Sequence, residues 1–187
     1  MQDEIRQMLH ESAEIKKRLD VDGIKKATHM IIGSLRKGGK IMIAGNGGSA
    51  TQASHFQGEL IGRFKMERAA LACISLTDLA TITALSNDYS YDIIFEKKIE
   101  ALGKKEDVFI GLSTSGNSEN IIRAIKKAKH IGMKAISLIG KGGGKMKGLA
   151  DVEIIVPSDN TPRIQESHGT ILHIISELVE REMFKDG

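Results

Sequence analysis

The alternation of short apolar runs with longer amphipathic stretches, from residue 40 onward, most constrains the fold of this chain. The apolar runs are "KIMIAG", "LACISL", "DVFIGLS", "KAISLIG" and "VEIIVP", and Gly, Ser or Asn closes most of them. Buried, nearly continuous apolar strands that are separated by helices are typical of a parallel sheet covered on both faces. The pattern therefore predicts an α/β fold built on a doubly wound parallel sheet flanked by helices.

The amphipathic stretches predict the helices between these strands. Their expected ranges are Ser49 to Phe64, Asp78 to Leu85, Tyr91 to Leu102, Glu119 to Ile131 and Pro162 to Phe184. Residues 1–37 show apolar residues at helical spacing, broken near "DVDG", which predicts two further helices. The first has a narrow apolar stripe, so we expect it to serve in oligomerisation rather than form a loosely packed arm. We expect a single domain over 1–187, with the helical pair (1–37) preceding the α/β core (38–187).

Composition and charge exclude several classes of protein. The 27 basic and 24 acidic residues are interspersed and leave a net charge of only +3, which gives little reason to propose a nucleic-acid partner. Cys73 is the single cysteine and the first twenty residues are charged throughout, so we expect a reduced, cytoplasmic protein. No apolar run approaches the about 20 residues that cross a bilayer, so we expect no membrane insertion.

Two glycine- and serine-rich turns follow predicted strands, where open α/β sheets bind their ligands. "GNGGSA" (45–50) follows "IMIA", and there Asn46 offers an amide and Ser49 a cap for the next helix. "STSGNS" (113–118) offers the hydroxyls of Ser113, Thr114, Ser115 and Ser118. Neither turn has the lysine of a nucleotide P-loop, and no acid ends "LACISLT" as a dinucleotide site requires. The pair of turns therefore favours a monophosphate ligand.

Histidines occur beside ligating oxygens at two places in the sequence. His55 and Glu59 lie four residues apart and so share one helix face, whereas Gln165, His168 and His173 lie on the otherwise apolar last helix. A solvated His/Glu pair and a core histidine are the ordinary interpretations of such residues. Together, two imidazoles, a carboxylate and an amide oxygen suit zinc or a similar divalent ion. Eight helical residues span about 12 Å, so two subunits can equally well supply the ligands.

With these motifs in place, the whole chain resembles the sugar isomerase (SIS) domain family, and within it the phosphoheptose isomerases. The resemblance rests on the N-terminal helical pair and on "GNGGSA" with "HFQGELIGRF", "LSNDYSYDIIFEKKIEALG", "DVFIGLSTSGNSENI" and "RIQESHGTILHIISELVE". It implies an isomerase that interconverts sedoheptulose 7-phosphate and D-glycero-D-manno-heptose 7-phosphate through an enediol(ate), the first step of ADP- or GDP-heptose synthesis for lipopolysaccharide or capsule. It also implies a cytoplasmic homotetramer whose active sites lie at subunit contacts.

The resemblance implies roles for the residues at matching positions. Glu59 and His173 fall at the positions of the catalytic acid/base pair. The implied ligands of one zinc ion per subunit are His55, Glu59, Gln165 and His173. The implied substrate-binding residues are Asn46, Gly47, Gly48, Ser49, Glu59, Arg63, Asn87, Asp88, Ser113, Thr114, Ser115, Ser118 and Gln165. The chain departs from the family at Gly58, where relatives often carry a second acid, so Glu59 has no acidic neighbour that could replace it.

A non-catalytic binding or regulatory protein is the main alternative. Regulators that bind the replication initiator, and sugar-phosphate sensors, are similar SIS proteins that keep the fold and the phosphate turns without the catalytic pair. The initiator-binding relatives resemble this chain in "RIQE" and "NDYSYD" but lack the acid at position 59 and the histidine at position 173. This chain has both residues, which favours the isomerase.

Overall fold

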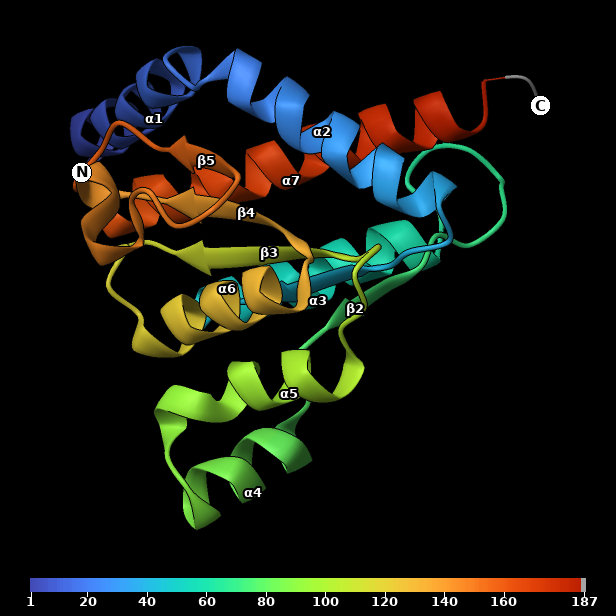
Figure 1. The fold of residues 1–187 in the computed structure, drawn as a ribbon. Coiled ribbons are helices and arrows are strands. Elements are labelled where there is room, and N and C mark those ends of the chain that lie inside the picture. Colours follow the sequence, from blue (N-terminus) through green and yellow to red (C-terminus); the bar gives the residue numbers. More distant parts are fainter. Residues whose placement is uncertain (186–187) are drawn as a thin grey trace.

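The computed structural model describes residues 1–185, and these form the predicted parallel sheet (Figure 1). The described residues contribute the strands β1 (Ile41–Ala44), β2 (Cys73–Ser75), β3 (Val108–Ser113), β4 (Lys134–Ile139) and β5 (Val152–Ile155). They pair in parallel in the order β2-β1-β3-β4-β5. From β1 the chain continues to the edge strand β2 and then crosses to the other side of β1, where it forms β3. The boundary between β1 and β3 is therefore a topological switch point.

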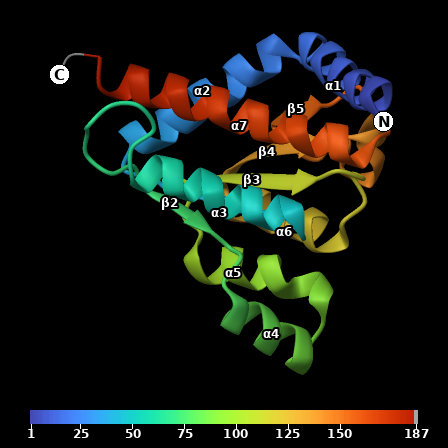
Figure 2. The same cartoon turned by 180° about the vertical axis from the view of Figure 1, so that it is seen from behind.

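Successive strand residues point into two separate cores, one on each face of the sheet. Ile41 and Ile43 pack into one core, whereas Met42 and Ala44 pack into the other. The first core is covered by α2 (Val21–Arg36), α3 (Gly48–Ile61) and α7 (Thr161–Met183), and the second by α5 (Ile94–Leu102) and α6 (Glu119–Ile131) (Figure 2). Of the helices in residues 1–185, none is long and apolar enough to cross a membrane.

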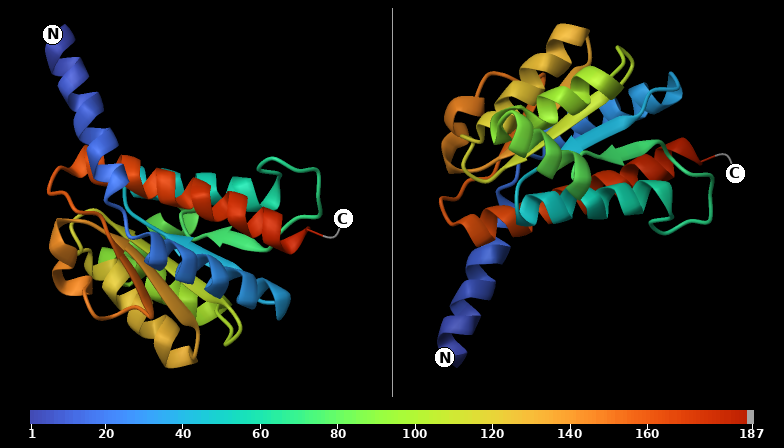
Figure 3. Two further views of the ribbon diagram at one scale, coloured as in Figure 1. Left: turned by 90° about the horizontal axis from the view of Figure 1, so that it is seen from above. Right: turned by 90° about the horizontal axis from the view of Figure 1, so that it is seen from below.

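The first helix, α1 (Gln2–Lys17), projects from the body of the molecule (Figure 3). Its second half is attached to α7, because Ser12 donates a hydrogen bond of 2.7 Å to Glu166 and Ile15 is buried. Residues 1–10 are exposed, and they include Ile5 and Leu9 at 50% and 66% exposure. A projecting helix with exposed apolar side chains suits a contact with another copy of the chain, and its role in oligomerisation remains a prediction.

The ends of α3 differ from the prediction. Gly47 is the residue that precedes the helix, so Ser49 does not cap it and is instead buried in the first turn. The helix ends at Ile61 rather than at Phe64. The reason is tertiary, since the backbone amide of Phe64 donates to a carboxylate of α7 instead of continuing the helix.

The segment after β2 forms α4 (Leu79–Asp88), which runs three residues beyond its predicted end. Asp78 caps this helix by accepting a hydrogen bond of 2.9 Å from the backbone of Thr81. The buried Lys98 of α5 donates to the Leu76 carbonyl and pairs with Asp78. The hydrogen bonds that Asp78 accepts from Lys98 and Thr81 hold the pKa of its carboxyl below the ordinary value. Although α4 has no buried residue of its own, this lysine attaches its start to α5.

A fully buried imidazole lies within α7, at His168. Burial lowers the pKa of His168 to about 4, and the nearby backbone of Ile139 opposes this effect. Within residues 1–185, neither ring nitrogen makes a hydrogen bond of normal geometry. His168 is therefore neutral in the folded protein, whereas the same side chain in the unfolded chain binds a proton below a pH of about 6.5.

We expect His168 to make folding sensitive to acid. Between about pH 6.5 and pH 4 the unfolded chain takes up a proton that the folded protein does not, so the free energy of unfolding falls as the pH falls. The slope from this group reaches about 1.4 kcal/mol per pH unit. Urea unfolding of the wild type and of His168→Asn across this range measures the difference. The variant should show the shallower dependence, and parallel curves would contradict the assignment.

Candidate functional site

The two glycine- and serine-rich turns meet at the switch point of the sheet. Because β1 and β3 are neighbours, with Ala44 opposite Gly111, the turns that follow them lie side by side. Asn46 in the first turn and Asn120 behind the second exchange amide hydrogen bonds, each of 3.0 Å. The hydroxyl of Tyr91 also donates to Asn46, at 2.8 Å. The two turns are thus one connected polar surface at the place where such sheets bind ligands.

Asn120 and Tyr91 are site residues that the sequence analysis missed. Asn120 is almost fully buried, and Tyr91 opens the short 3₁₀ turn η1 (Tyr91–Ile93) that precedes α5. A signal was present, since both lie within motifs that carry the family resemblance. Sequence alone does not identify them, because the partner of both side chains is Asn46, which is distant in the sequence and comes close only through the pairing of β1 with β3.

The serine turn is a compact set of hydroxyls at the start of α6. The Oγ atom of Ser113 lies 2.9 Å from that of Ser118 and 3.4 Å from that of Ser115. It also accepts a hydrogen bond from the backbone of Gly116 at 3.1 Å. Ser118 is the N-cap residue, as expected, but its hydroxyl contacts Ser113 instead of capping the helix. Thr114 lies between these serines and is partly buried.

The glycine-rich segment "GKGGGK" (140–145) lies behind the serine turn and overlaps η2 (Lys141–Met146), a 3₁₀ segment that is interrupted by non-helical glycines. Gly116 has a φ of +67°, and a Cβ atom there would lie 2.1 Å from the Gly143 carbonyl oxygen. The Met146 amide donates to the Gly116 carbonyl at 2.9 Å, and the Lys145 amide donates to Asn117 Oδ1 at 3.0 Å. These close contacts with η2 fix the shape of the serine turn from behind.

His55, Glu59 and His173 converge on the outer surface between α3 and α7, which run side by side in the same direction (Figure 3). His55 Nε2 lies 3.0 Å from Glu59 Oε1 and 3.0 Å from His173 Nε2. One ligand atom from each of the three residues lies within 4.8 Å of the others. The His55 side chain is 58% exposed and that of Glu59 is 21% exposed, so the cluster is open to solvent.

The donor set and spacing of this cluster fit a divalent metal ion such as zinc. Two imidazole nitrogens and a carboxylate oxygen are ordinary zinc ligands, and Zn–N distances of about 2.0–2.1 Å place tetrahedral ligand atoms about 3.3 Å apart. The imidazole nitrogens, 3.0 Å apart, need to move only slightly to reach this separation. Three protein ligands on an open surface leave a further position for substrate, water or another ligand.

Gln165, expected among the metal ligands, lies at the first glycine turn. A Cβ atom on Gly48 would lie 2.4 Å from Gln165 Nε2, so the lack of a side chain at Gly48 makes room for this amide. The backbone carbonyl of Gln165 accepts a hydrogen bond of 2.7 Å from Gln52 of α3. Eight residues of α7 separate Gln165 from His173, which is about 12 Å along the helix.

The remaining expected substrate-binding residues lie at the ends of α4 and α3 and in the first glycine turn. Asn87 and Asp88 end α4, where the amide of Asn87 donates to the Asp88 carboxylate at 2.8 Å. They lie within four residues of Tyr91, whose hydroxyl donates a hydrogen bond to Asn46 in the first glycine turn. Arg63 lies in the loop after α3, and its exposed guanidinium pairs with Glu67 at 3.1 Å. Gly47 adopts a φ of +55° directly before α3.

The architecture and its motifs match a known family. A family model for the SIS domain matches residues 3–140. The chain belongs to the SIS-domain family. Within that family, it is 52% identical over 177 residues to the phosphoheptose isomerase of Helicobacter pylori (strain P12), covering 93% of this chain and 92% of that protein. It is 45% identical over 191 residues to the phosphoheptose isomerase of Geobacter sp. (strain M21), covering all of both chains.

A solved structure shows the same SIS fold along nearly the whole chain. The phosphoheptose isomerase from Neisseria gonorrhoeae superimposes with a TM-score of 0.90 at 36% sequence identity. The match covers 96% of this chain and 98% of that one. The resemblance inferred from the sequence is therefore confirmed, both for the SIS domain and for its phosphoheptose isomerase branch.

We expect Gly48→Ala to displace the Gln165 amide without unfolding the protein. The atoms in the way of the new Cβ are the end of a flexible side chain, which can rotate aside. Gly58→Ala is the control in the same helix, since its Cβ would meet nothing within 4 Å among the described residues, and it should stabilise the protein by about 0.5–1 kcal/mol. Thermal unfolding and crystal structures of both variants measure these effects. An unmoved Gln165 in Gly48→Ala would contradict the steric argument.

Proposed function

We propose that this protein is an aldose–ketose isomerase that interconverts sedoheptulose 7-phosphate and D-glycero-D-manno-heptose 7-phosphate. The observation that carries the proposal is the convergence of Glu59 and His55, on the helix that begins at the first glycine turn, with His173 of α7. The relatives named phosphoheptose isomerase support the substrate class. The proposed role is the first step of heptose precursor synthesis for lipopolysaccharide or capsule, carried out in the cytoplasm.

The sugar phosphate is proposed to lie along the start of α3. The hydroxyls of Ser113, Ser115 and Ser118, together with the start of α6, bind the phosphate as neutral donors. Seven residues separate Gly48 from His55, which is about 10 Å along the helix. An extended seven-carbon chain with a terminal phosphate has a comparable length. A phosphate at the turns therefore leaves the carbonyl end of the sugar near the Glu59 cluster.

The isomerisation moves one proton between carbons and one between oxygens. Glu59 takes the proton from C1 of the ketose as the C1–C2 enediol forms, and later returns it to C2. His173 gives a proton to the C2 oxygen and accepts one from the C1 hydroxyl, so its imidazole regains its initial protonation state. The opposite order converts the aldose to the ketose. No atom is gained or lost, and Glu59 needs no acidic neighbour.

His55, Glu59 and His173 are also proposed to hold a divalent ion, with zinc favoured by the donor set. When bound, the ion supplies Lewis-acid polarisation of the substrate carbonyl. Glu59 cannot be a free base and a tight ligand together, so its coordination is proposed to be monodentate or exchangeable. Because Gln165 lies at the first glycine turn of its own chain, we propose that a Gln165 from another copy completes the set within a homotetramer.

We expect Glu59→Gln to lower turnover by about 10² to 10⁴, the usual size for the loss of a general base, while the fold stays intact. The amide keeps the shape of the carboxylate but cannot accept the proton. Steady-state kinetics with sedoheptulose 7-phosphate measure the loss, and circular dichroism checks the fold. Glu100→Gln, an exposed change on the other side of the sheet, is the control. Near-normal turnover in Glu59→Gln would remove this residue from the mechanism.

The proposed activity itself is tested with the pure wild-type protein. Sedoheptulose 7-phosphate is incubated with the protein, with and without a chelator, and the appearance of aldoheptose phosphate is followed. Product formation supports the isomerase, and its loss with chelator supports the metal. An unchanged ketose in the presence of added zinc would favour the non-catalytic sugar-phosphate binding protein.

We expect Ser118→Ala to raise the Michaelis constant more than it lowers turnover. The phosphate is bound alike in the ground and transition states, so a lost hydroxyl weakens both complexes. Ser118 suits the test because its hydroxyl contacts Ser113 and does not cap α6. Kinetics over a range of substrate concentrations separate the two constants. A fall confined to turnover would place Ser118 near the reacting carbons instead.

A further inference from the structure

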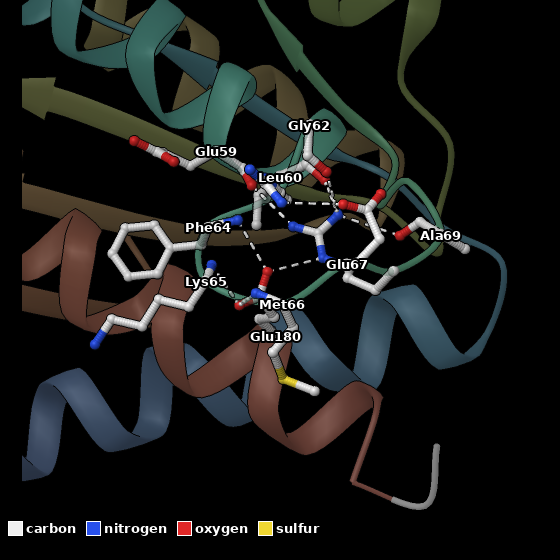
Figure 4. Close-up of polar contacts among 11 residues, drawn as sticks. Glu59, Leu60, Gly62, Phe64, Lys65, Met66, Glu67, Ala69 and Glu180 are labelled. Atoms are coloured by element: carbon white, nitrogen blue, oxygen red, sulfur yellow. Dashed lines mark hydrogen bonds and ion pairs between the residues drawn. The ribbon is translucent and has the colours of Figure 1, made fainter.

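A buried ion pair joins the loop after α3 to the second half of α7. Arg68 Nε lies 3.0 Å from Glu180 Oε2, and both side chains are only 2% exposed. Figure 4 shows the Glu180 carboxylate beneath the loop, with the backbone of Phe64 turned toward it. Burying two charges costs free energy that their attraction does not reliably return, so such a pair is weak evidence for stability. Its hydrogen bonds indicate another role.

The Glu180 carboxylate fixes the path of the loop. It accepts hydrogen bonds from three consecutive backbone amides: Phe64 at 2.9 Å, Lys65 at 2.8 Å and Met66 at 2.9 Å. Burial alone would raise the pKa of Glu180, but these amides and Arg68 outweigh it and hold that pKa below its ordinary value. The carboxylate is therefore charged, and it binds the loop to α7 through the backbone.

The Arg68 guanidinium binds the last turn of α3, whereas its partner Glu180 belongs to α7. It donates to the carbonyls of Leu60, Gly62 and Glu59, each at 2.8 Å, and to that of Ala69 at 3.1 Å. The last carbonyls of a helix have no hydrogen-bond partners within the helix. Here the planar guanidinium of Arg68 donates the missing hydrogen bonds. One of the carbonyls belongs to Glu59 itself, the proposed base.

The pair thus connects both helices of the proposed catalytic cluster. Glu180 lies seven residues after His173, about 10 Å further along α7 and on the same side of the helix. The Phe64 ring, whose backbone Glu180 holds, packs against the His173 ring with centroids 5.9 Å apart. The His173 ring is oriented by two contacts: its Nε2 atom lies 3.0 Å from His55 Nε2, and it packs against the Phe64 ring.

We propose that Arg68 and Glu180 are positioning residues that hold Glu59 of α3 and His173 of α7 in register, through the end of α3 and the Phe64 ring. The proposal rests on the proposed function, because it assigns the support of that same cluster. Partners of metal ligands outside the coordination sphere typically change metal affinity or activity by about 10- to 100-fold when they are replaced. We assign an effect of that size to this pair.

The test compares Arg68→Lys with Glu177→Gln. Lysine keeps the charge but cannot reach all the carbonyls that the guanidinium binds. Glu177→Gln breaks the exposed Lys65–Glu177 pair, which joins the same loop to the same helix at 2.8 Å, and is the matched control. Ile99→Val, in the core on the other face, lowers stability without touching α3 or α7. Affinity for Co²⁺, measured from its visible absorption, is the main readout, with kcat and KM measured separately.

We expect Arg68→Lys to bind Co²⁺ about 10- to 100-fold more weakly than Glu177→Gln and to lower kcat by a similar factor, with little change in KM. Ile99→Val should match the wild type in Co²⁺ affinity and in kcat, even if its Tm falls as far as that of Arg68→Lys. Equal Co²⁺ affinity in Arg68→Lys and Glu177→Gln would overturn the positioning role. The readout is separate from turnover. If the wild type binds Co²⁺ but does not isomerise the sugar, the proposed function is overturned. The comparison of Co²⁺ affinities then still decides whether Arg68 and Glu180 are positioning residues.

A second variant covers the case in which Arg68→Lys does not fold. Phe64→Leu keeps the backbone amide that Glu180 binds and removes the ring that packs on His173. We expect this variant to fold and to bind Co²⁺ about tenfold more weakly than the wild type, at the low end of the range for such supporting contacts. Wild-type Co²⁺ affinity in Phe64→Leu would overturn the proposed path from Glu180 to His173.

Discussion

The pairing of β1 with β3 is the interaction on which the site depends. These central strands put two turns that are almost seventy residues apart in the sequence next to each other at one edge of the sheet. The reciprocal amide bonds between Asn46 and Asn120 then connect the turns directly. Everything proposed for phosphate binding follows from this juxtaposition, because hydroxyls on one turn and glycines on the other make a binding surface only when they face the same ligand.

Much of the fold could be predicted from the sequence, because the signals are local. Five apolar runs closed by small residues indicate buried parallel strands, and the apolar spacing along residues 162–184 indicates a long helix. His55 and Glu59 share a helix face by their spacing alone. The glycine and serine turns were identifiable for the same reason, since the chemistry of each lies within six consecutive residues.

The features that escaped prediction depend on contacts between distant segments. Arg68 in a loop and Glu180 in a polar position of a helix both look like solvated surface charges, yet both are almost fully buried. The early end of α3 at Ile61 has the same origin, since the amides that would have continued the helix bind Glu180. The "GKGGGK" segment likewise gains its shape from contacts with Gly116. Sequence spacing carries no signal for such partners.

The parallel course of α3 and α7 has an electrostatic consequence. Peptide dipoles of neighbouring antiparallel helices largely cancel, whereas those of parallel helices add. The positive ends of both macrodipoles therefore lie together near Gly48 and Gln165, and α3 directs its negative end at the Arg68 guanidinium. Because Glu180 balances the charge of Arg68 at that end, the field of the two helices is left uncompensated only at their starts, and an anion docked there would meet the positive ends of both helices at once.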